Sequence, residues 1–172
     1  MTIIKLETDI LFGQLDNTTS LFLKLIESTN EKLIHIIPFK NSWTIAQLAS
    51  HVTKSIKGIA QSMEMQGQPA LRNADERVEE IKKTFLNFNI KFQSPEFILP
   101  TKTIYSKEQV VQKLEDAIEQ LKNMRGKADF TEVISLPAFG EITKFELLNF
   151  VVFHTQRHIH QLQIMLKHLK AA

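Results

Sequence analysis

The sequence has no cysteine, which excludes disulfide bridges and thiolate metal ligands. Such a composition suits a reducing compartment, and we expect a cytoplasmic protein. The first residues, MTIIKLETDILFGQLD, lack the apolar run and the small-residue cleavage site of a signal peptide. The longest apolar run covers only residues 150–153, far short of the ~18 residues that a membrane helix needs. We therefore expect no membrane partner.

Neither sign of charge is in clear excess. The chain has 21 Lys and Arg against 19 Asp and Glu, for a net charge of +2. No basic stripe with interleaved aromatic residues is present, so we expect no nucleic-acid partner. Glycine and proline are also scarce, at five each, which is few for a turn-rich all-β chain. The length of 172 residues fits one domain, and we expect residues 1–172 to form it.

Apolar residues recur at helical spacing in four long segments, which predicts an all-α four-helix bundle. These segments are residues 8–29, 44–65, 106–126 and 143–169. The later three each begin with a capping box, in which two side chains three residues apart cover N–H groups of the first turn. The pairs are Thr44 with Gln47, Ser106 with Gln109, and Thr143 with Glu146. The predicted buried stripe of the first helix is Ile10, Leu11, Leu15, Thr18, Leu21, Phe22, Leu25 and Ile26.

A long crossover separates the second and third predicted helices. Its charged amphipathic stretch, residues 75–83, predicts a short helix. Residues 94–100 contain two X-Pro steps and predict extended chain, because a residue before proline avoids the helical region. A crossover of this length is able to lie over the bundle and shape a pocket. Residues 136–141 predict a simple loop before the last helix.

Three of the six histidines interrupt apolar helix faces. His154 and His158 are four residues apart and lie on one face, in line with Leu147 and Val151. His51 interrupts the apolar stripe of the second helix. A neutral imidazole binds zinc, nickel, iron or copper without adding charge. Three of them predict a metal centre with a fourth position left for water or substrate.

The same pattern has a plainer interpretation. Histidine pairs at this spacing are common, and three inward-facing imidazoles are also compatible with hydrogen-bonded core residues. The zinc-protease motif is absent, because Thr155 occupies the place of its glutamate. No general base is therefore specified. We interpret His35, His160 and His168 as solvated residues or as neighbours of the site.

Three segments resemble the DinB-like superfamily, including its YfiT and bacillithiol-transferase relatives. Residues 41–51 resemble the Trp-Ser/Thr entry into the second helix, which ends at the first ligand. Residues 137–143 resemble the loop that opens the last helix, and residues 153–162 resemble the H-x-x-x-H-x-x-Gln segment that carries the other two ligands. One departure is His160, at a position that is often small in relatives. A slight rotation of the helix would bring His160 to the metal's surroundings or to a dimer partner.

The resemblance implies a four-helix bundle, frequently a homodimer, with the metal ligands His51, His154 and His158 near the open end of the bundle. It also implies metal-dependent small-molecule chemistry, by thiol transferases, isomerases or suspected hydrolases. We accordingly expect a divalent ion, zinc or nickel, and a small-molecule substrate such as a low-molecular-weight thiol. The alternative is a non-catalytic binding or stress-response bundle with a structural or vestigial centre. A fourth position that opens to a pocket would favour the enzyme.

Overall fold

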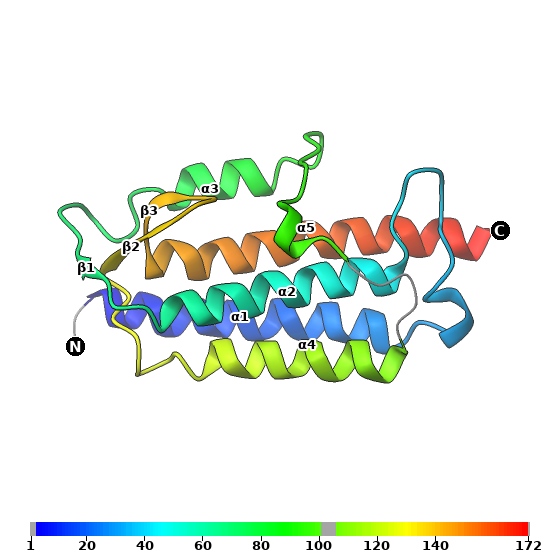
Figure 1. The fold of residues 1–172 in the computed structure, drawn as a ribbon, viewed down its shortest axis with the longest axis horizontal. Coiled ribbons are helices and arrows are strands. Elements are labelled where there is room, and N and C mark those ends of the chain that lie inside the picture. Colours follow the sequence, from blue (N-terminus) through cyan, green and yellow to red (C-terminus); the bar gives the residue numbers. More distant parts are fainter. Residues whose placement is uncertain (1–2, 101–105, 172) are drawn as a thin grey trace.

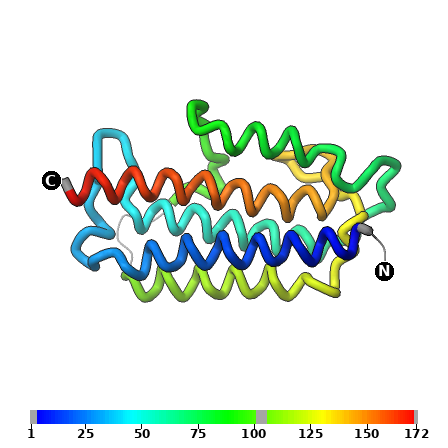
Figure 2. Tube along the Cα trace, turned by 180° about the vertical axis from the view of Figure 1, so that it is seen from behind, coloured from blue at the N-terminus to red at the C-terminus, as the bar shows by residue number. Residues whose placement is uncertain are grey.

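The computed structural model describes residues 3–100 and 106–171, and its four long helices form the predicted bundle (Figure 1). They are α1 (Ile3–Glu27), α2 (Ile45–Met63), α4 (Lys107–Lys122) and α5 (Lys144–Ala171). Helix α4 packs against α1 and α2, and α5 packs against the same two helices, which gives the order α1–α4–α2–α5 around the bundle. The colour gradient shows that α2 and α4 run in the same direction, opposite to α1 and α5 (Figures 1 and 2). Because α2 and α4 are parallel neighbours, the chain must return along the bundle between them.

That return is the crossover, and it contains β1 (Gln68–Pro69), α3 (Val78–Phe85) and the short 3-10 helix η2 (Glu96–Ile98). A second 3-10 helix, η1 (Glu31–Leu33), lies between α1 and α2. The predicted short helix is confirmed as α3, which packs on α5, while η2 packs on α2. The crossover therefore covers the side of the bundle where α2 and α5 meet (Figure 1).

The predicted loop before the last helix covers only the turn of a β-hairpin: residues 137–139 form that turn, while Leu136, Gly140 and Glu141 belong to its strands. Strands β2 (Glu132–Leu136) and β3 (Gly140–Thr143) pair antiparallel, and β1 adds to β2 to give the order β1-β2-β3. Ile134 and Ile142 face each other across the hairpin, and both are buried. A Cβ on Gly67 would lie 2.6 Å from that of Glu132, so the approach of the chain to β2 requires glycine. The sheet is minor beside the helices.

The predicted capping boxes agree with the structure better than the predicted buried stripe of α1 does. Reciprocal hydrogen bonds form both the Thr44–Gln47 box and the Thr143–Glu146 box. Two members of the predicted stripe of α1 are wrong, because Ile10 is 56% and Leu21 is 46% exposed. The helix begins at Ile3 rather than residue 8 and ends at Glu27 rather than residue 29. None of the helices in the described residues is both long and apolar enough to cross a membrane.

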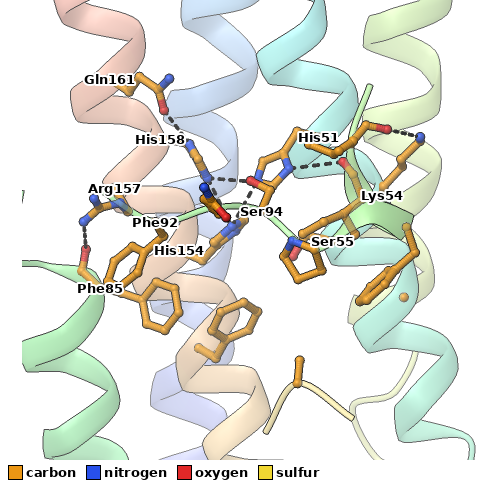
Figure 3. Close-up of a pocket in the computed structure, with 18 of the residues that line it drawn as sticks. His51, Lys54, Ser55, Phe85, Phe92, Ser94, His154, Arg157, His158 and Gln161 are labelled. Carbon is orange, nitrogen blue, oxygen red and sulfur yellow. Dashed lines mark hydrogen bonds between the residues drawn. The ribbon is translucent and has the colours of Figure 1, made fainter. Parts of the chain in front are cut away.

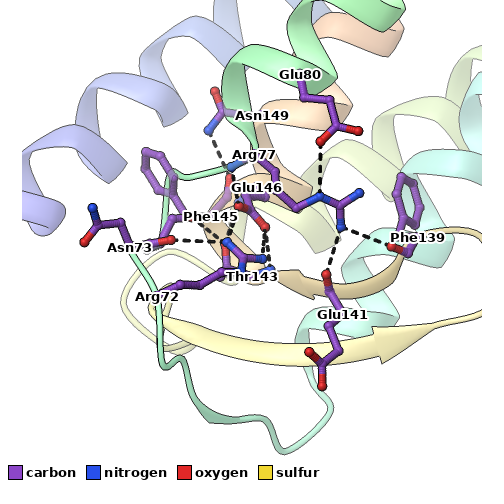
Figure 4. Close-up of polar contacts among 11 residues, drawn as sticks. Arg72, Asn73, Arg77, Glu80, Phe139, Glu141, Thr143, Phe145, Glu146 and Asn149 are labelled. Atoms are coloured by element: carbon purple, nitrogen blue, oxygen red, sulfur yellow. Dashed lines mark hydrogen bonds and ion pairs between the residues drawn. The ribbon is translucent and has the colours of Figure 1, made fainter.

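A buried carboxylate fastens the crossover to the start of α5 (Figure 4). Glu146 is completely buried, and it accepts two hydrogen bonds from Arg72, at 2.5 and 2.7 Å. It also accepts hydrogen bonds from the backbone N–H groups of Arg77 and Thr143, at 2.8 and 2.9 Å. Burial alone would raise the pKa of Glu146, but these hydrogen bonds outweigh it and hold the pKa below its usual value. Through this carboxylate the segment that precedes α3 is held over α5.

We predict that Glu146→Ala lowers the free energy of unfolding by about 3 kcal/mol. The substitution leaves the Arg72 guanidinium and two backbone N–H groups without their acceptor, and Arg72 is 22% exposed, which places the loss at the low end for a broken buried ion pair. Urea denaturation followed by circular dichroism measures it. The matched control is Glu115→Ala, an exposed carboxylate on α4, which should change the value by less than about 0.5 kcal/mol. Equal effects of the two substitutions would contradict this role of Glu146.

Candidate metal centre

The structure brings His51, His154 and His158 together between α2 and α5 (Figure 3). The Nε2 atom of His51 lies 3.3 Å from that of His154 and 3.2 Å from that of His158. The Nε2 atoms of His154 and His158 are 3.1 Å apart. The three nitrogens thus form a nearly equilateral triangle. His154 and His158 lie part-way along α5, and His51 lies in the second turn of α2.

The size of this triangle suits a first-row divalent ion. A tetrahedral ion bound by imidazole at about 2.0–2.1 Å holds its nitrogens about 3.3–3.4 Å apart, whereas octahedral angles at the same bond length give about 2.9 Å. The observed separations are 3.1, 3.2 and 3.3 Å, and the two longer ones are nearer the tetrahedral value. The three histidines are therefore positioned to bind a divalent metal ion.

Hydrogen bonds outside the triangle set the tautomers of two of the imidazoles. The Nδ1 of His51 lies 3.2 Å from the carbonyl oxygen of Ile98, and the Nδ1 of His158 lies 2.9 Å from Oε1 of Gln161. These oxygens only accept, so both Nδ1 atoms donate and both Nε2 atoms carry a lone pair. Such an outer partner is the usual companion of a metal-binding histidine. Two lone pairs that face each other at this distance repel unless a cation lies between them.

His154 is held in a different way, by aromatic rings. Its ring centroid lies 5.0 Å from that of Phe150 and 6.0 Å from that of Phe85. Its Nδ1 is buried and makes no hydrogen bond within the described part of the chain. Packing, rather than an outer acceptor, thus orients the second histidine of the triangle.

Burial keeps all three imidazoles neutral. Their exposed fractions are 2% for His51, 6% for His154 and 7% for His158. Burial lowers the pKa of His158 to about 3, and the neighbouring His51 adds to this effect. The pKa of His154 lies well below its usual value for the same two reasons, burial and the adjacent imidazoles. Burial also lowers the pKa of His51. Neutral imidazole is the form that binds metals.

The centre opens into a pocket of about 1260 Å³ between the bundle and the crossover (Figure 3). We call residues 85–99 the roof of this pocket. From α5, Arg157 donates to the carbonyl oxygens of Phe85, Asn87 and Ile90, and its guanidinium lies 4.7 Å from the ring centroid of Phe92. From α2, His51 and Lys54 hold the other end of the roof. The pocket's aromatic wall is Phe39, Trp43, Phe85, Phe88, Phe92, Phe97, Phe139 and Phe150.

The other three histidines stay outside the triangle. His160 lines the pocket, where it stacks on Phe88 at a centroid distance of 4.1 Å and an interplanar angle of 11°. His168 lies 4.9 Å from the ring of Phe39, and His35 is half-buried. Sequence reasoning assigned no role to Gln161 or Arg157. Gln161 follows His158 by three residues, which places it on the same helix face and is a usable signal. Arg157 has no such signal, because its partners are backbone carbonyls of the roof.

We predict about one equivalent of bound zinc or nickel per chain, lost in His154→Ala. Trp43 is the only tryptophan, and its ring lies 5.1 Å from that of His51, so its fluorescence reports on the centre. Titrating chelated protein with nickel should quench the emission to a plateau at one equivalent. The control is His160→Ala, which removes an imidazole of the pocket that is not part of the triangle. It should still reach the fluorescence plateau at one equivalent of nickel. A wild-type protein that binds no ion after reconstitution would rule out the centre.

We predict that the metal-free protein loses stability as the pH falls from 7.5 to 5.5. The unfolded chain takes up protons on its histidines near pH 6.5, whereas native His158 stays neutral down to about pH 3. The unfolded state therefore binds more protons in this window, and stability rises with pH. Urea midpoints of chelated protein at both pH values measure the slope. His158→Gln removes one of these groups and should flatten it; an unchanged slope would show that His158 titrates normally.

Comparisons with known proteins agree with this architecture. The sequence model of the DinB superfamily matches residues 14–162. A solved structure described as TT2238, a four-helix bundle protein, superposes with a TM-score of 0.60 and 18% identity, covering 91% of this chain and 98% of that one. At that identity it supports the fold alone. No curated protein matches the chain. The family match spans most of the sequence, including all three histidines of the triangle, and the chain belongs to the DinB superfamily.

Proposed function

We propose that this protein is a metal-dependent enzyme that transfers a low-molecular-weight thiol to a small electrophile, with His51, His154 and His158 as its metal ligands. The observation that carries the proposal is the opening of a buried three-histidine triangle into a large aromatic pocket. Catalytic sites keep a coordination position free for substrate, while structural sites are closed by protein ligands. The open side of the triangle therefore supports the enzyme over the alternative of a structural or vestigial centre.

A bound divalent ion would lower the pKa of an incoming thiol, which is a far better nucleophile as thiolate. The protein's own part is to prepare that position. The Ile98 carbonyl and the Gln161 side chain hold two imidazoles in the tautomer that points Nε2 inward. The aromatic wall offers apolar surface to the electrophile, and the roof shields the reacting atoms from bulk water. Sulfur then bonds to the electrophilic carbon, the leaving group departs with its electron pair, and the thiol proton passes to solvent.

The close variant is a hydrolase, and the pocket lining weighs against it. Hydrolysis at a metal centre is usually assisted by a carboxylate that takes the proton from water. No aspartate or glutamate lines the pocket in the described residues. Thiol transfer needs no such base, since the thiol ionises more readily than water. The thiol and the homodimer stay predictions from the family resemblance, and the cytoplasmic location stays a prediction from the sequence composition.

We predict that the reconstituted protein accelerates the reaction of 1-chloro-2,4-dinitrobenzene with one or more of cysteine, glutathione and bacillithiol. His51→Ala should lower kcat/KM at least about 100-fold, because the centre loses a ligand. Product absorbance measures the rate, and metal analysis of each sample accompanies it. The control His35→Ala removes an imidazole that does not line the pocket and should leave the rate unchanged.

Two other outcomes would contradict thiol transfer in different ways. Hydrolysis of p-nitrophenyl esters by the same samples, lost in His51→Ala, would select the hydrolase. Full metal occupancy without either activity across the panel would select the binding module.

A further inference from the structure

The charged residues that line the pocket are all basic, although the chain as a whole is nearly balanced in charge. The whole sequence has 21 basic and 19 acidic residues. Four cationic side chains line the pocket, namely Lys54, Lys57, Lys91 and Arg157, and no carboxylate lies among the described residues that line it. A metal ion at the centre would add further positive charge. Low-dielectric walls around charges of one sign concentrate ligands of the opposite sign.

Lys54 is the cation best placed to act on a ligand at the centre. It follows His51 by three residues on α2, and its charge is close enough to help lower the pKa of that histidine. Its ammonium donates one hydrogen bond to the carbonyl oxygen of Leu99, at 2.5 Å. An ammonium has three N–H donors, so two are left for a ligand. Figure 3 shows Lys54 on the same side of α2 as the pocket, with Ser55 beside it.

The other cations are less suited to this role. Three carbonyl oxygens of the roof already occupy the guanidinium of Arg157, which serves to position the chain there. Lys57 is exposed one turn further along α2, and Lys91 is exposed on the roof. Both add to the field of the pocket, but Lys54 lies closer than Lys57 to His51 along α2.

We propose that the pocket binds a small amphipathic organic anion, with its apolar body against the aromatic wall and its carboxylate on Lys54 beside the histidine centre. Lys54 is then a specificity-determining residue, which selects the anionic reactant over a neutral one of the same shape. This inference rests on the proposed function in taking the pocket as a substrate site. It goes beyond that function in stating which charge the substrate carries.

The test compares 4-phenylbutyrate with 4-phenyl-1-butanol, which share one apolar body and differ in charge. Binding to chelated full-length protein is followed by Trp43 fluorescence, which avoids direct coordination of the carboxylate by a metal. Wild-type protein should bind the anion about tenfold more tightly, as expected for one hydrogen bond to a charged group. Lys54→Met should bring the ratio close to one, and Lys54→Arg should restore it.

The matched control is Lys113→Met, an exposed lysine on α4 that does not line the pocket, and it should keep the wild-type ratio. Equal affinity for both compounds in the wild type would overturn the proposal. So would a tenfold ratio that survives in Lys54→Met, since the discrimination would then come from another group.

A second arm separates this inference from thiol transfer. Cobalt-loaded protein is titrated with 3-mercaptopropionate and 2-mercaptoethanol, and the sulfur-to-cobalt absorption band is followed. Preference for the anionic thiol that is lost in Lys54→Met supports both proposals. If neither thiol gives a band while the phenylbutyrate ratio still depends on Lys54, thiol transfer fails and the anion site stands. Bands of equal strength for both thiols, unaffected by Lys54→Met, overturn the anion site and leave thiol transfer intact.

Discussion

The parallel arrangement of α2 and α4 is the constraint on which the rest of the structure depends. Two neighbouring helices that run in the same direction need a connection as long as themselves. This connection passes over the side where α2 and α5 meet (Figure 1). Its residues 85–99 form the roof of the pocket. A bundle with short loops throughout would leave the three histidines on an open surface. The topology thus turns a pair of helix faces into an enclosed site.

A crossover with little core of its own must be held by polar contacts. Among the large apolar residues of the crossover that the structure describes, only Ile81 is buried. Glu146 holds its start through Arg72 and the backbone of Arg77, and Arg157 holds the segment after α3 through three carbonyl oxygens. Near its end, His51 donates to the Ile98 carbonyl. The last of these contacts joins the roof directly to the metal centre, so the position of the roof and the orientation of one ligand depend on each other.

The features that sequence reasoning recovered are those with a local physical cause. Capping boxes are formed by residues three apart, and a histidine pair four apart shares a helix face, so Thr143, Glu146, His154 and His158 were interpretable without a structure. The missed features need partners far apart in the chain. The hairpin was missed because its strands are only five and four residues long, and their pairing with β1 joins segments more than 60 residues apart. The second role of Glu146, as acceptor for Arg72, was hidden for the same reason.

The three histidines form an arrangement that is electrostatically unfavourable without a cation. Three neutral imidazoles are buried with their Nε2 atoms within 3.3 Å of one another, and outer hydrogen bonds to two of them turn lone pairs toward the same point. Hydrogen bonding within the triangle cannot satisfy all three nitrogens at once, because a nitrogen whose ring donates through Nδ1 has no proton to offer. Such a buried arrangement is unfavourable alone and becomes favourable when a cation occupies the shared point. A core histidine selected only for stability would have its nitrogens paired with donors or acceptors, whereas His51 and His158 are paired on the outer side and turn two lone pairs inward, where His154 has at most one proton to offer. That asymmetry is the strongest physical reason to regard the triangle as a binding site rather than as part of the core.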